Sequence, residues 1–398
     1  MADVVVIGGS FAGLAAALEL RRLLPSGSSV TVVSASDRFV FMPSLIWVMQ
    51  GWREPDDLTF SIQPMLDTAS VDFKHARVEA ILPDERTVSL NTGESLHYDR
   101  LVIAAGGEWD WDQIPGSRPR PDGHNTSILS LPDALSAREY WQAFLSDPGP
   151  IVVGIALGGS LYGAAYEMVL NLDVALRQAE IREECSITLV TPEPYLGHFG
   201  LEGIGNSRTV IESAFRHRDI LYAAEKQIRE VESDRLVVSP LQHFPSKLTM
   251  LIPPYRGIKP VREVPDLGDE QGLIPVDAYQ RSVQYPDIYA AGTAARIDEQ
   301  PTGLLPLGRF TPGTVSAEMG RLAAANVAAD LGSGDPRPRT EESLKAFYVM
   351  DSGADGLLMS LGPQSWLNLQ TRVPGPWSHW AKSLAERYQM WQVQTGKY

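Results

Sequence analysis

The fold is decided by one stretch close to the start of the chain, Asp3-Val4-Val5-Val6-Ile7-Gly8-Gly9-Ser10-Phe11-Ala12-Gly13. Its apolar beginning predicts a buried strand, and a glycine-rich turn follows at once. Leu14–Leu24 then repeats apolar residues at helical spacing, and Pro25 and Gly27 end the predicted helix. Val30–Val33 predicts the next strand. Glycines let the backbone N–H groups of such a turn approach a pyrophosphate at the helix N-terminus, so the segment predicts a β-α-β dinucleotide-binding unit.

The turn departs from the strict glycine fingerprint, and the usual acid after the second strand is missing. Ser10 occupies the middle glycine position, where a small side chain still fits. In the usual arrangement an acid at the end of the second strand binds the ribose hydroxyls. Ser34-Ala35-Ser36 stands there instead, so we expect ribose recognition by hydroxyl or backbone groups, with Asp37 as a less favoured substitute.

Two later segments indicate that the nucleotide is FAD. Tyr98-Asp99-Arg100-Leu101-Val102-Ile103-Ala104-Ala105-Gly106-Gly107 resembles the strand and turn with which two-dinucleotide flavoproteins return to the FAD. Tyr285-Pro286-Asp287-Ile288-Tyr289-Ala290-Ala291-Gly292-Thr293 resembles their second FAD motif, with Thr293 where an aspartate is common. We therefore expect non-covalent FAD. The residues expected to contact it are Gly8, Ser10, Phe11, Ala12, Gly13, Ser34, Ser44, Ala105, Gly106, Gly292 and Thr293.

A second unit of the same type begins after Pro148-Gly149-Pro150. Ile151–Val153 predicts its first strand, a glycine-containing turn and a helix reaching about Gln178 follow, and Ile187–Val190 predicts the second strand. In relatives that use NADH, an acid follows this strand, but here Thr191-Pro192 stands there. A dinucleotide fold kept as a scaffold is therefore favoured over an active NAD(P)H site.

These units predict an α/β protein with two dinucleotide-binding (Rossmann-type) domains and a C-terminal module. We expect the FAD-binding domain to be discontinuous, from residues 1–110 and 276–332. The second, NAD-domain-like unit is expected over residues 111–275, and the C-terminal module over residues 337–398.

Three longer motifs point to one family. They are Phe41-Met42-Pro43-Ser44-Leu45-Ile46-Trp47-Val48, residues 159–167, ending Ala165-Tyr166-Glu167, and residues 193–200, containing Tyr195-Leu196-Gly197-His198. They resemble segments of the sulfide:quinone oxidoreductases, which are FAD-dependent members of the pyridine nucleotide-disulfide oxidoreductases. The first motif resembles the stretch that lies beneath the isoalloxazine in that family. The resemblance implies the fold, bound FAD and a quinone as acceptor.

The cysteines on which that family's sulfide chemistry depends are missing. Its three sulfur positions are occupied here by Leu129, Leu161 and Tyr348, and Cys185 is the only cysteine of the chain. A thiolate is the nucleophile that accepts sulfide, and neither leucine nor a phenol can store sulfane sulfur. We expect Cys185 to be a packed residue and the persulfide mechanism to be lost.

Two side chains are candidates for proton transfer beside the flavin. His198 lies in a loop between Gly197 and Gly200, and histidine titrates near neutral pH. Glu167 lies on the predicted helix of the second unit among apolar neighbours, where burial would raise the pKa of a carboxyl. Each also has a structural interpretation, a hydrogen bond that holds a loop or a helix. The spacing of the histidines implies no metal site.

The C-terminal module is dense in aromatic residues. Trp366, Trp377, Trp380, Tyr388 and Trp391 are mixed with basic residues, a composition that suits the lipid headgroup layer. The family uses this region to cover the flavin and to reach the membrane quinone pool. Packing on the flavin domain or on a partner subunit explains these residues equally well.

Charge and composition narrow the setting. The formal net charge of −15 argues against a nucleic-acid partner, because nothing would neutralise the phosphates. No apolar run approaches the roughly 20 residues of a spanning helix, and a single cysteine fits a reducing compartment. We expect a cytoplasmic protein, free or peripheral on the inner face of the membrane, with its oligomeric state left open.

The sequence thus predicts an FAD-dependent oxidoreductase of sulfide:quinone oxidoreductase type without the cysteine relay. Electrons would pass from an unidentified donor through FAD to a quinone or a small redox partner. One alternative is an NADH:acceptor reductase resembling type II NADH dehydrogenases. The other is a catalytically idle FAD-containing subunit of a complex.

Overall fold

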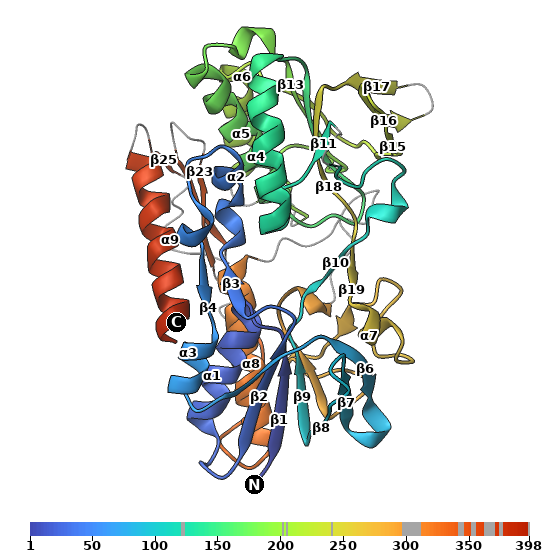
Figure 1. Ribbon diagram of the computed structural model, residues 1–398, viewed down its shortest axis with the longest axis vertical. Coiled ribbons are helices and arrows are strands. Elements are labelled where there is room, and N and C mark those ends of the chain that lie inside the picture. Colours follow the sequence, from blue (N-terminus) through green and yellow to red (C-terminus); the bar gives the residue numbers. More distant parts are fainter. Residues whose placement is uncertain are drawn as a thin grey trace.

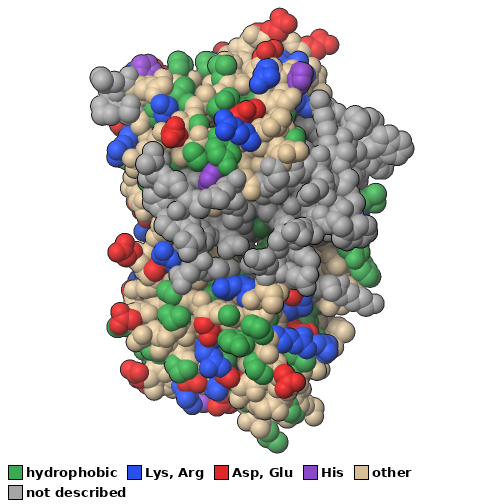
Figure 2. Space-filling model, turned by 180° about the vertical axis from the view of Figure 1, so that it is seen from behind, with side chains coloured by type: hydrophobic (Ala, Val, Ile, Leu, Met, Phe, Trp, Pro, Cys, Tyr) green, Lys and Arg blue, Asp and Glu red, His purple; other side chains and the backbone are tan. Residues whose placement is uncertain are grey.

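The computed structural model describes residues 1–120, 124–200, 203, 206–239, 242–296, 312–340, 346–351, 356–361, 371–373 and 377–396. Two α/β layers follow one another along the long axis of the molecule, and helix α9 (Trp377–Thr395) runs along one side and ends beside the layer that contains the N-terminus (Figure 1). Acidic and basic side chains are interspersed over the face in Figure 2. The α/β prediction is confirmed.

The first layer is a parallel five-stranded sheet. Its order is β21 (Ile288–Ala290), β9 (Arg100–Ile103), β1 (Asp3–Ile7), β2 (Ser29–Ser34) and β5 (Asp72–His75). Helices α1 (Phe11–Leu23) and α8 (Gly313–Asp330) pack against each other on it. A Cβ at Gly320 would lie 2.1 Å from the Ala12 carbonyl oxygen, so this glycine permits the close helix contact. One FAD motif follows the carboxyl end of β1 and another follows that of β21. These two strand ends lie at the same edge of the sheet.

The second layer is also a parallel five-stranded sheet. Its order is β11 (Asn125–Thr126), β18 (Leu248–Ile252), β12 (Ile151–Ile155), β13 (Ile187–Val190) and β14 (Leu221–Ala223). Its helices are α4 (Leu131–Ser146), α5 (Tyr162–Gln178) and α6 (Ser207–His217).

Each layer carries a small antiparallel sheet. The first has β6 (Val78–Leu82), β7 (Thr87–Leu90) and β8 (Ser95–His97), and the second has β15 (Glu230–Val231), β16 (Arg235–Ser239) and β17 (Gln242–Pro245). A third, β23 (Ala346–Asp351), β24 (Gly356–Leu361) and β25 (Thr371–Val373), precedes α9. The remaining short elements are β3 (Arg38–Val40), η1 (Met42–Ser44), α2 (Leu45–Met49), η2 (Pro55–Asp57), β4 (Thr59–Ser61), α3 (Gln63–Thr68), η3 (Pro83–Glu85), η4 (Trp111–Gln113), η5 (Arg182–Glu184), β20 (Ile274–Pro275), η6 (Gly292–Ala294) and β22 (Ala295–Arg296).

Two paired strands carry the chain between the layers. β10 (Gly107–Trp109) leaves the first layer, and β19 (Tyr255–Gly257) returns to it and pairs with β10 antiparallel (Figure 1). Directly after β19, α7 (Lys259–Arg262) packs on β6, and Val261 and Leu267 join the core beneath the first sheet. We therefore propose that the second unit ends near Gly257 rather than at residue 275.

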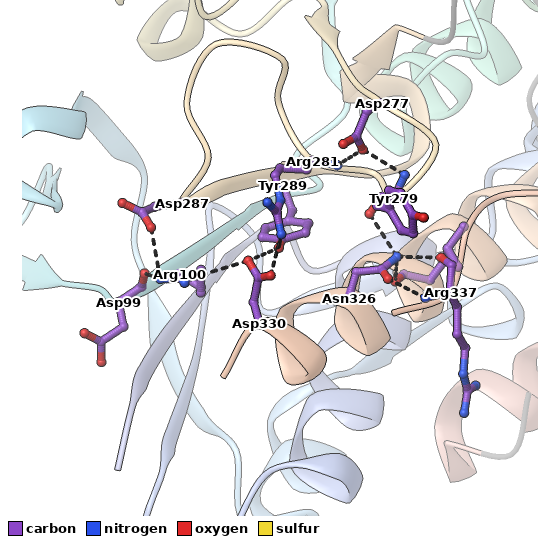
Figure 3. A network of polar contacts seen from close by, with 11 residues as sticks. Asp99, Arg100, Asp277, Tyr279, Arg281, Asp287, Tyr289, Asn326, Asp330 and Arg337 are labelled. Carbon is purple, nitrogen blue, oxygen red and sulfur yellow. Dashed lines mark hydrogen bonds and ion pairs between the residues drawn. The ribbon is translucent and has the colours of Figure 1, made fainter. Parts of the chain in front are cut away.

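A polar network fixes the C-terminal end of α8 to the first sheet (Figure 3). The Tyr289 hydroxyl of β21 donates to Asp330 Oδ2 at 2.5 Å, and Arg100 Nε of β9 lies 3.4 Å from the same oxygen. Further along the chain, the backbone N–H of Arg337 donates to Asn326 Oδ1 at 2.7 Å. With its far end held in this way, α8 presents its first residues at the carboxyl edge of the sheet.

Within the described residues, no helix combines the length and the apolar character that crossing a bilayer requires.

Candidate functional site

One cavity of about 410 Å³ lies where the two layers and α9 meet. It is bordered by the turn after β1, the segment before α2, the beginnings of α5 and α8, and the inner face of α9. The predicted site residues that line it are Ser10, Phe11, Ala12, Ala105, Gly106, Glu167, Gly292 and Thr293. Segments from four distant parts of the sequence therefore converge on one space.

Two expected residues, Gly8 and Gly13, shape the turn without lining the cavity. Gly8 has φ +123°, and a Cβ there would lie 2.4 Å from the Ala104 carbonyl oxygen. A Cβ at Gly13 would lie 1.9 Å from the Gly8 carbonyl oxygen. Side chains are therefore excluded at both positions, and the first turn of α1 stays close to the end of β1, as a nucleotide-binding turn requires.

The residues at the cavity suit FAD. The glycine turn leads into α1, whose N-cap residue Ser10 makes no side-chain capping bond, so N–H groups and a hydroxyl remain for a ligand. At the start of α8, Thr314 Oγ1 is shielded from solvent without a hydrogen-bond partner in the described part of the chain. A buried hydroxyl left unpaired is costly unless a ligand satisfies it. This donor set matches a pyrophosphate and polyol ligand.

Ser34 and Ser44 do not line the cavity. Ser34 Oγ accepts a hydrogen bond from the backbone N–H of Ser36 at 3.3 Å, near the turn. The fully buried Ser44 hydroxyl donates to Glu386 Oε2 on α9. A direct cofactor contact therefore stays a prediction for both serines.

Glu386 is a cavity residue that sequence reasoning missed. Its side chain is 3% exposed and lines the cavity from α9. Arg53 Nε lies 3.3 Å from Glu386 Oε1, and Arg53 Nη2 donates to Ser383 Oγ at 2.7 Å. The Arg53 guanidinium also stacks over the Trp47 ring at 4.8 Å. One buried ion pair thus attaches the C-terminal helix to the segment that forms the cavity wall.

The part of the cavity wall that corresponds to cysteine positions of the related family is apolar. Leu129 and Leu161 line the cavity. Cys185 is 2% exposed and does not line the cavity. Burial raises the pKa of its thiol, and this favours the protonated, unreactive form. The side chain of Tyr348 and the tryptophans Trp366, Trp377 and Trp380 lie outside the described side chains.

The two predicted proton-transfer residues occupy different places. Glu167 is buried at 4% exposure and lines the cavity from α5. His198 is equally buried but does not line the cavity, and its ring contacts Tyr195 with centroids 5.1 Å apart. The structure therefore places Glu167, and not His198, beside the expected cofactor.

The loop of His198 is organised by a buried carboxyl, Glu193. Glu193 Oε2 accepts hydrogen bonds from the Tyr166 hydroxyl at 2.7 Å and the Thr191 hydroxyl at 2.8 Å, and Oε1 accepts from the Phe199 N–H at 2.7 Å. Burial raises the pKa of Glu193 to about 7, although these hydrogen bonds oppose the rise. The acid nearest to the end of β13 is thus directed into the protein.

Tyr255 is a further cavity residue without a sequence signal. It lies on β19, and its hydroxyl is 2.9 Å from Thr293 Oγ1. No periodicity or motif marks it, because its role depends on how β19 crosses between the layers.

Comparisons with known proteins agree with this geometry. A family model described as pyridine nucleotide-disulphide oxidoreductase matches residues 2–330. A sulfide-quinone reductase of Aquifex aeolicus is 30% identical over 404 residues, covering 99% of this chain and 91% of that protein. The crystal structure of the Aquifex aeolicus sulfide:quinone oxidoreductase superimposes with a TM-score of 0.88 at 30% identity, covering 100% of this chain and 92% of that one. An NADH dehydrogenase-like protein of Mycobacterium tuberculosis is 26% identical over 344 residues, 83% of this chain and 81% of that protein.

Proposed function

Because this chain belongs to the pyridine nucleotide-disulphide oxidoreductase family and is a flavin-dependent oxidoreductase that binds FAD, we propose a function of sulfide:quinone oxidoreductase type without a cysteine sulfur relay. In this proposal a small donor other than sulfide supplies the electrons, and a quinone or a small redox partner receives them. The observation that carries it is the pair Leu129 and Leu161 on the cavity wall, where sulfur chemistry would need thiols.

The residues that would hold FAD are those around the glycine turn and the start of α8. Ser10 and the N–H groups at the beginning of α1 suit a pyrophosphate, and Thr293 and Thr314 add hydroxyls. Bound FAD supplies the capacity to accept an electron pair and to return it, which no side chain of this chain can do.

The cavity wall includes the apolar side chains of Leu129, Leu161 and Met168. An apolar wall suits the ring of a quinone, since ligand pockets bind mostly through apolar contacts with a few polar groups. The relatives named above as a sulfide-quinone reductase and an NADH dehydrogenase-like protein support an oxidoreductase, and the first also supports a quinone acceptor.

Glu167 is the proposed proton-transfer residue of the cavity. A quinone that takes up two electrons also takes up two protons, so a titratable group at the site is needed. The Glu167 carboxyl is buried and lines the cavity, and α5 holds it there. We assign it the task of holding a proton at a carboxyl oxygen and delivering it to the acceptor.

His198 receives a secondary role in the proposal. It stands in the loop that Glu193 and Tyr166 fix, away from the cavity lining. We propose that it relays protons between solvent and the cavity through the loop. Equal rates of quinone reduction in His198→Ala and the wild type would return it to a structural role.

The outward face of α9 is the proposed membrane contact. Leu384, Tyr388 and Trp391 are 64%, 57% and 46% exposed, while Met390 and Val393 of the same helix pack into the core. An exposed apolar stripe on a docked helix suits the lipid interface. Sedimentation with anionic vesicles tests this membrane contact. The wild type should sediment with the vesicles, and the double variant Leu384→Ser/Trp391→Ser should stay in the supernatant. If a partner subunit covers α9 instead, the wild type should also stay in the supernatant.

The hydrogen bonds of Glu193 argue against the alternative of an NADH:acceptor reductase. The carboxyl that follows β13, Glu193, is fully buried and accepts three hydrogen bonds within the protein, so it does not serve as a ribose ligand. Losing an acid-to-ribose contact costs about 1.5–3 kcal/mol, roughly ten- to a hundredfold in affinity. We therefore expect NADH to bleach the flavin slowly and with weak saturation.

An anaerobic stopped-flow screen tests the proposal. NADH, NADPH, sulfide, low-molecular-weight thiols and a hydroquinone are each mixed with the holoprotein, and the visible flavin absorbance is followed. Bleaching by a donor other than sulfide, NADH or NADPH supports the proposed function. Fast bleaching by micromolar NADH would favour the dehydrogenase alternative, and no bleaching by any of them would favour an idle subunit.

A further inference from the structure

The hydroxyl groups of Tyr255 and Thr293 form a pair on the cavity wall. Tyr255 Oη and Thr293 Oγ1 are 2.9 Å apart, and both residues line the cavity. Thr293 lies in η6, the short helix after β21, whereas Tyr255 lies on β19, the strand that returns from the second layer. The pair therefore joins two segments that meet only in the folded protein.

The backbone leaves room for the Tyr255 ring at two glycines. Gly106 has φ +66°, and a Cβ there would lie 2.9 Å from Tyr255 Oη and 3.2 Å from Thr293 Oγ1. A Cβ at Gly107 would lie 2.8 Å from Tyr255 Cε1. The Trp109 ring contacts the phenol edge to face, with centroids 5.1 Å apart. The position of the phenol is thus fixed on several sides, as a binding group requires.

The pair retains hydrogen-bonding capacity after its internal bond is made. Two hydroxyls carry two hydrogens, of which one is used between them, and the Gly107 backbone also bonds to the Tyr255 hydroxyl. One hydrogen and the remaining lone pairs are left for a ligand. Burial raises the pKa of Tyr255 to about 12, which keeps the phenol neutral near pH 7. A neutral pair can donate to a phosphate oxygen or bond a polyol hydroxyl without the repulsion that a carboxylate would exert on phosphate.

We propose that the Tyr255–Thr293 hydroxyl pair binds the oxygen-rich chain between the two ring systems of FAD, in place of a single acid. The Thr314 hydroxyl, buried without a partner in the described part of the chain, lines the same cavity and completes the set. This inference rests on FAD binding alone and is independent of the identity of donor and acceptor.

The pair also connects the cofactor to the crossing between the layers. β19 pairs with β10, and these strands carry the chain from one layer to the other (Figure 1). A ligand that engages Tyr255 therefore holds this crossing as well as the first layer. FAD binding should accordingly protect residues 107–109 and 255–257 from hydrogen exchange.

The test is the FAD dissociation constant of hydroxyl-deletion variants. It is measured from the rise in flavin fluorescence when the holoprotein is diluted. Tyr255→Phe and Thr293→Val should each raise the dissociation constant about three- to tenfold, the usual loss for one hydrogen bond. Thr293→Ser keeps the hydroxyl and should bind as the wild type does. Tyr140→Phe, which removes a hydroxyl bonded to the Lys247 carbonyl oxygen outside the cavity, is the matched control.

Folding effects are separated by a second measurement. The melting temperatures with and without excess FAD are compared, because a lost ligand contact lowers the stabilisation by FAD and leaves the apoprotein unchanged. Dissociation constants equal to that of the wild type in both Tyr255→Phe and Thr293→Val would overturn the proposal. The proposal would also be overturned if a variant lowered the melting temperature of the apoprotein while FAD still raised the melting temperature as much as in the wild type. That result would mark a purely structural hydrogen bond.

Discussion

Glu193 should make the folded protein lose stability as the pH rises from about 4.5 to about 7. Burial raises the pKa of this carboxyl from 4.5 to about 7 in the folded state. Between these values the folded protein keeps the proton that the unfolded chain has already lost, so unfolding releases a proton and rising pH favours it. The contribution is fully present below the lower pKa and is lost above the higher one.

The magnitude follows from the two pKa values. They differ by roughly 2.5, and each tenfold change in proton affinity is about 1.4 kcal/mol, so roughly 3 kcal/mol of unfolding free energy should depend on this group. The buried groups that face it are the Tyr166 hydroxyl of α5, the Thr191 hydroxyl and the backbone of Phe199. They moderate the effect by stabilising the carboxylate.

Urea unfolding across this pH range, in the wild type and in Glu193→Gln, isolates the effect. The amide cannot titrate, so the difference in unfolding free energy between the two proteins should change by roughly 3 kcal/mol across the window. Glu225→Gln is the matched control, because Glu225 is an exposed carboxyl whose backbone N–H donates to the Glu193 carbonyl oxygen. A difference in unfolding free energy between the wild type and Glu193→Gln that stays constant with pH would show that Glu193 does not cause this pH dependence.

Three further predictions concern the cavity. Gly13→Ala should abolish FAD retention during purification, because its Cβ would lie 1.9 Å from the Gly8 carbonyl oxygen; a yellow protein would contradict this. Glu386→Gln should lower the free energy of unfolding by about 2–4 kcal/mol, because it leaves the mostly buried Arg53 without its carboxylate partner. The same substitution should speed proteolysis within α9. Sulfide should drive no quinone turnover, and Leu161→Cys alone should not restore it, because the relay passes sulfur between two thiols; turnover on the order of 1–1000 per second would sink that prediction.

The sequence predicts those parts of the fold whose causes are local. β1 was expected over Asp3–Ile7 and lies there, and α5 ends at Gln178 as expected. Both follow from apolar patterning next to a turn, which a short window contains. The contact between Glu167 and the cavity is of the same kind, since it follows from the position of the residue on a helix after a glycine turn.

Other features could not be predicted because they depend on the assembled fold. The bond between Ser44 and Glu386 joins residues 342 positions apart, and Ser44 was instead expected to contact the cofactor. Tyr255 reaches Thr293 only because β19 crosses back beside β10. The sequence shows only that Thr191-Pro192 stands where a ribose acid is expected, and the folded loop is needed to show that the nearby Glu193 carboxyl is directed inward.

The most direct test is a pair of anaerobic stopped-flow experiments on the holoprotein. The bound flavin is first reduced photochemically and then mixed with a water-soluble quinone, while a second sample of oxidised protein is mixed with sulfide. We predict saturable reoxidation of the flavin by the quinone at a rate on the order of 1–1000 per second, slowed in Glu167→Gln, and no bleaching by sulfide. Rapid bleaching by sulfide, or reoxidation by quinone no faster than that of free flavin, would contradict it.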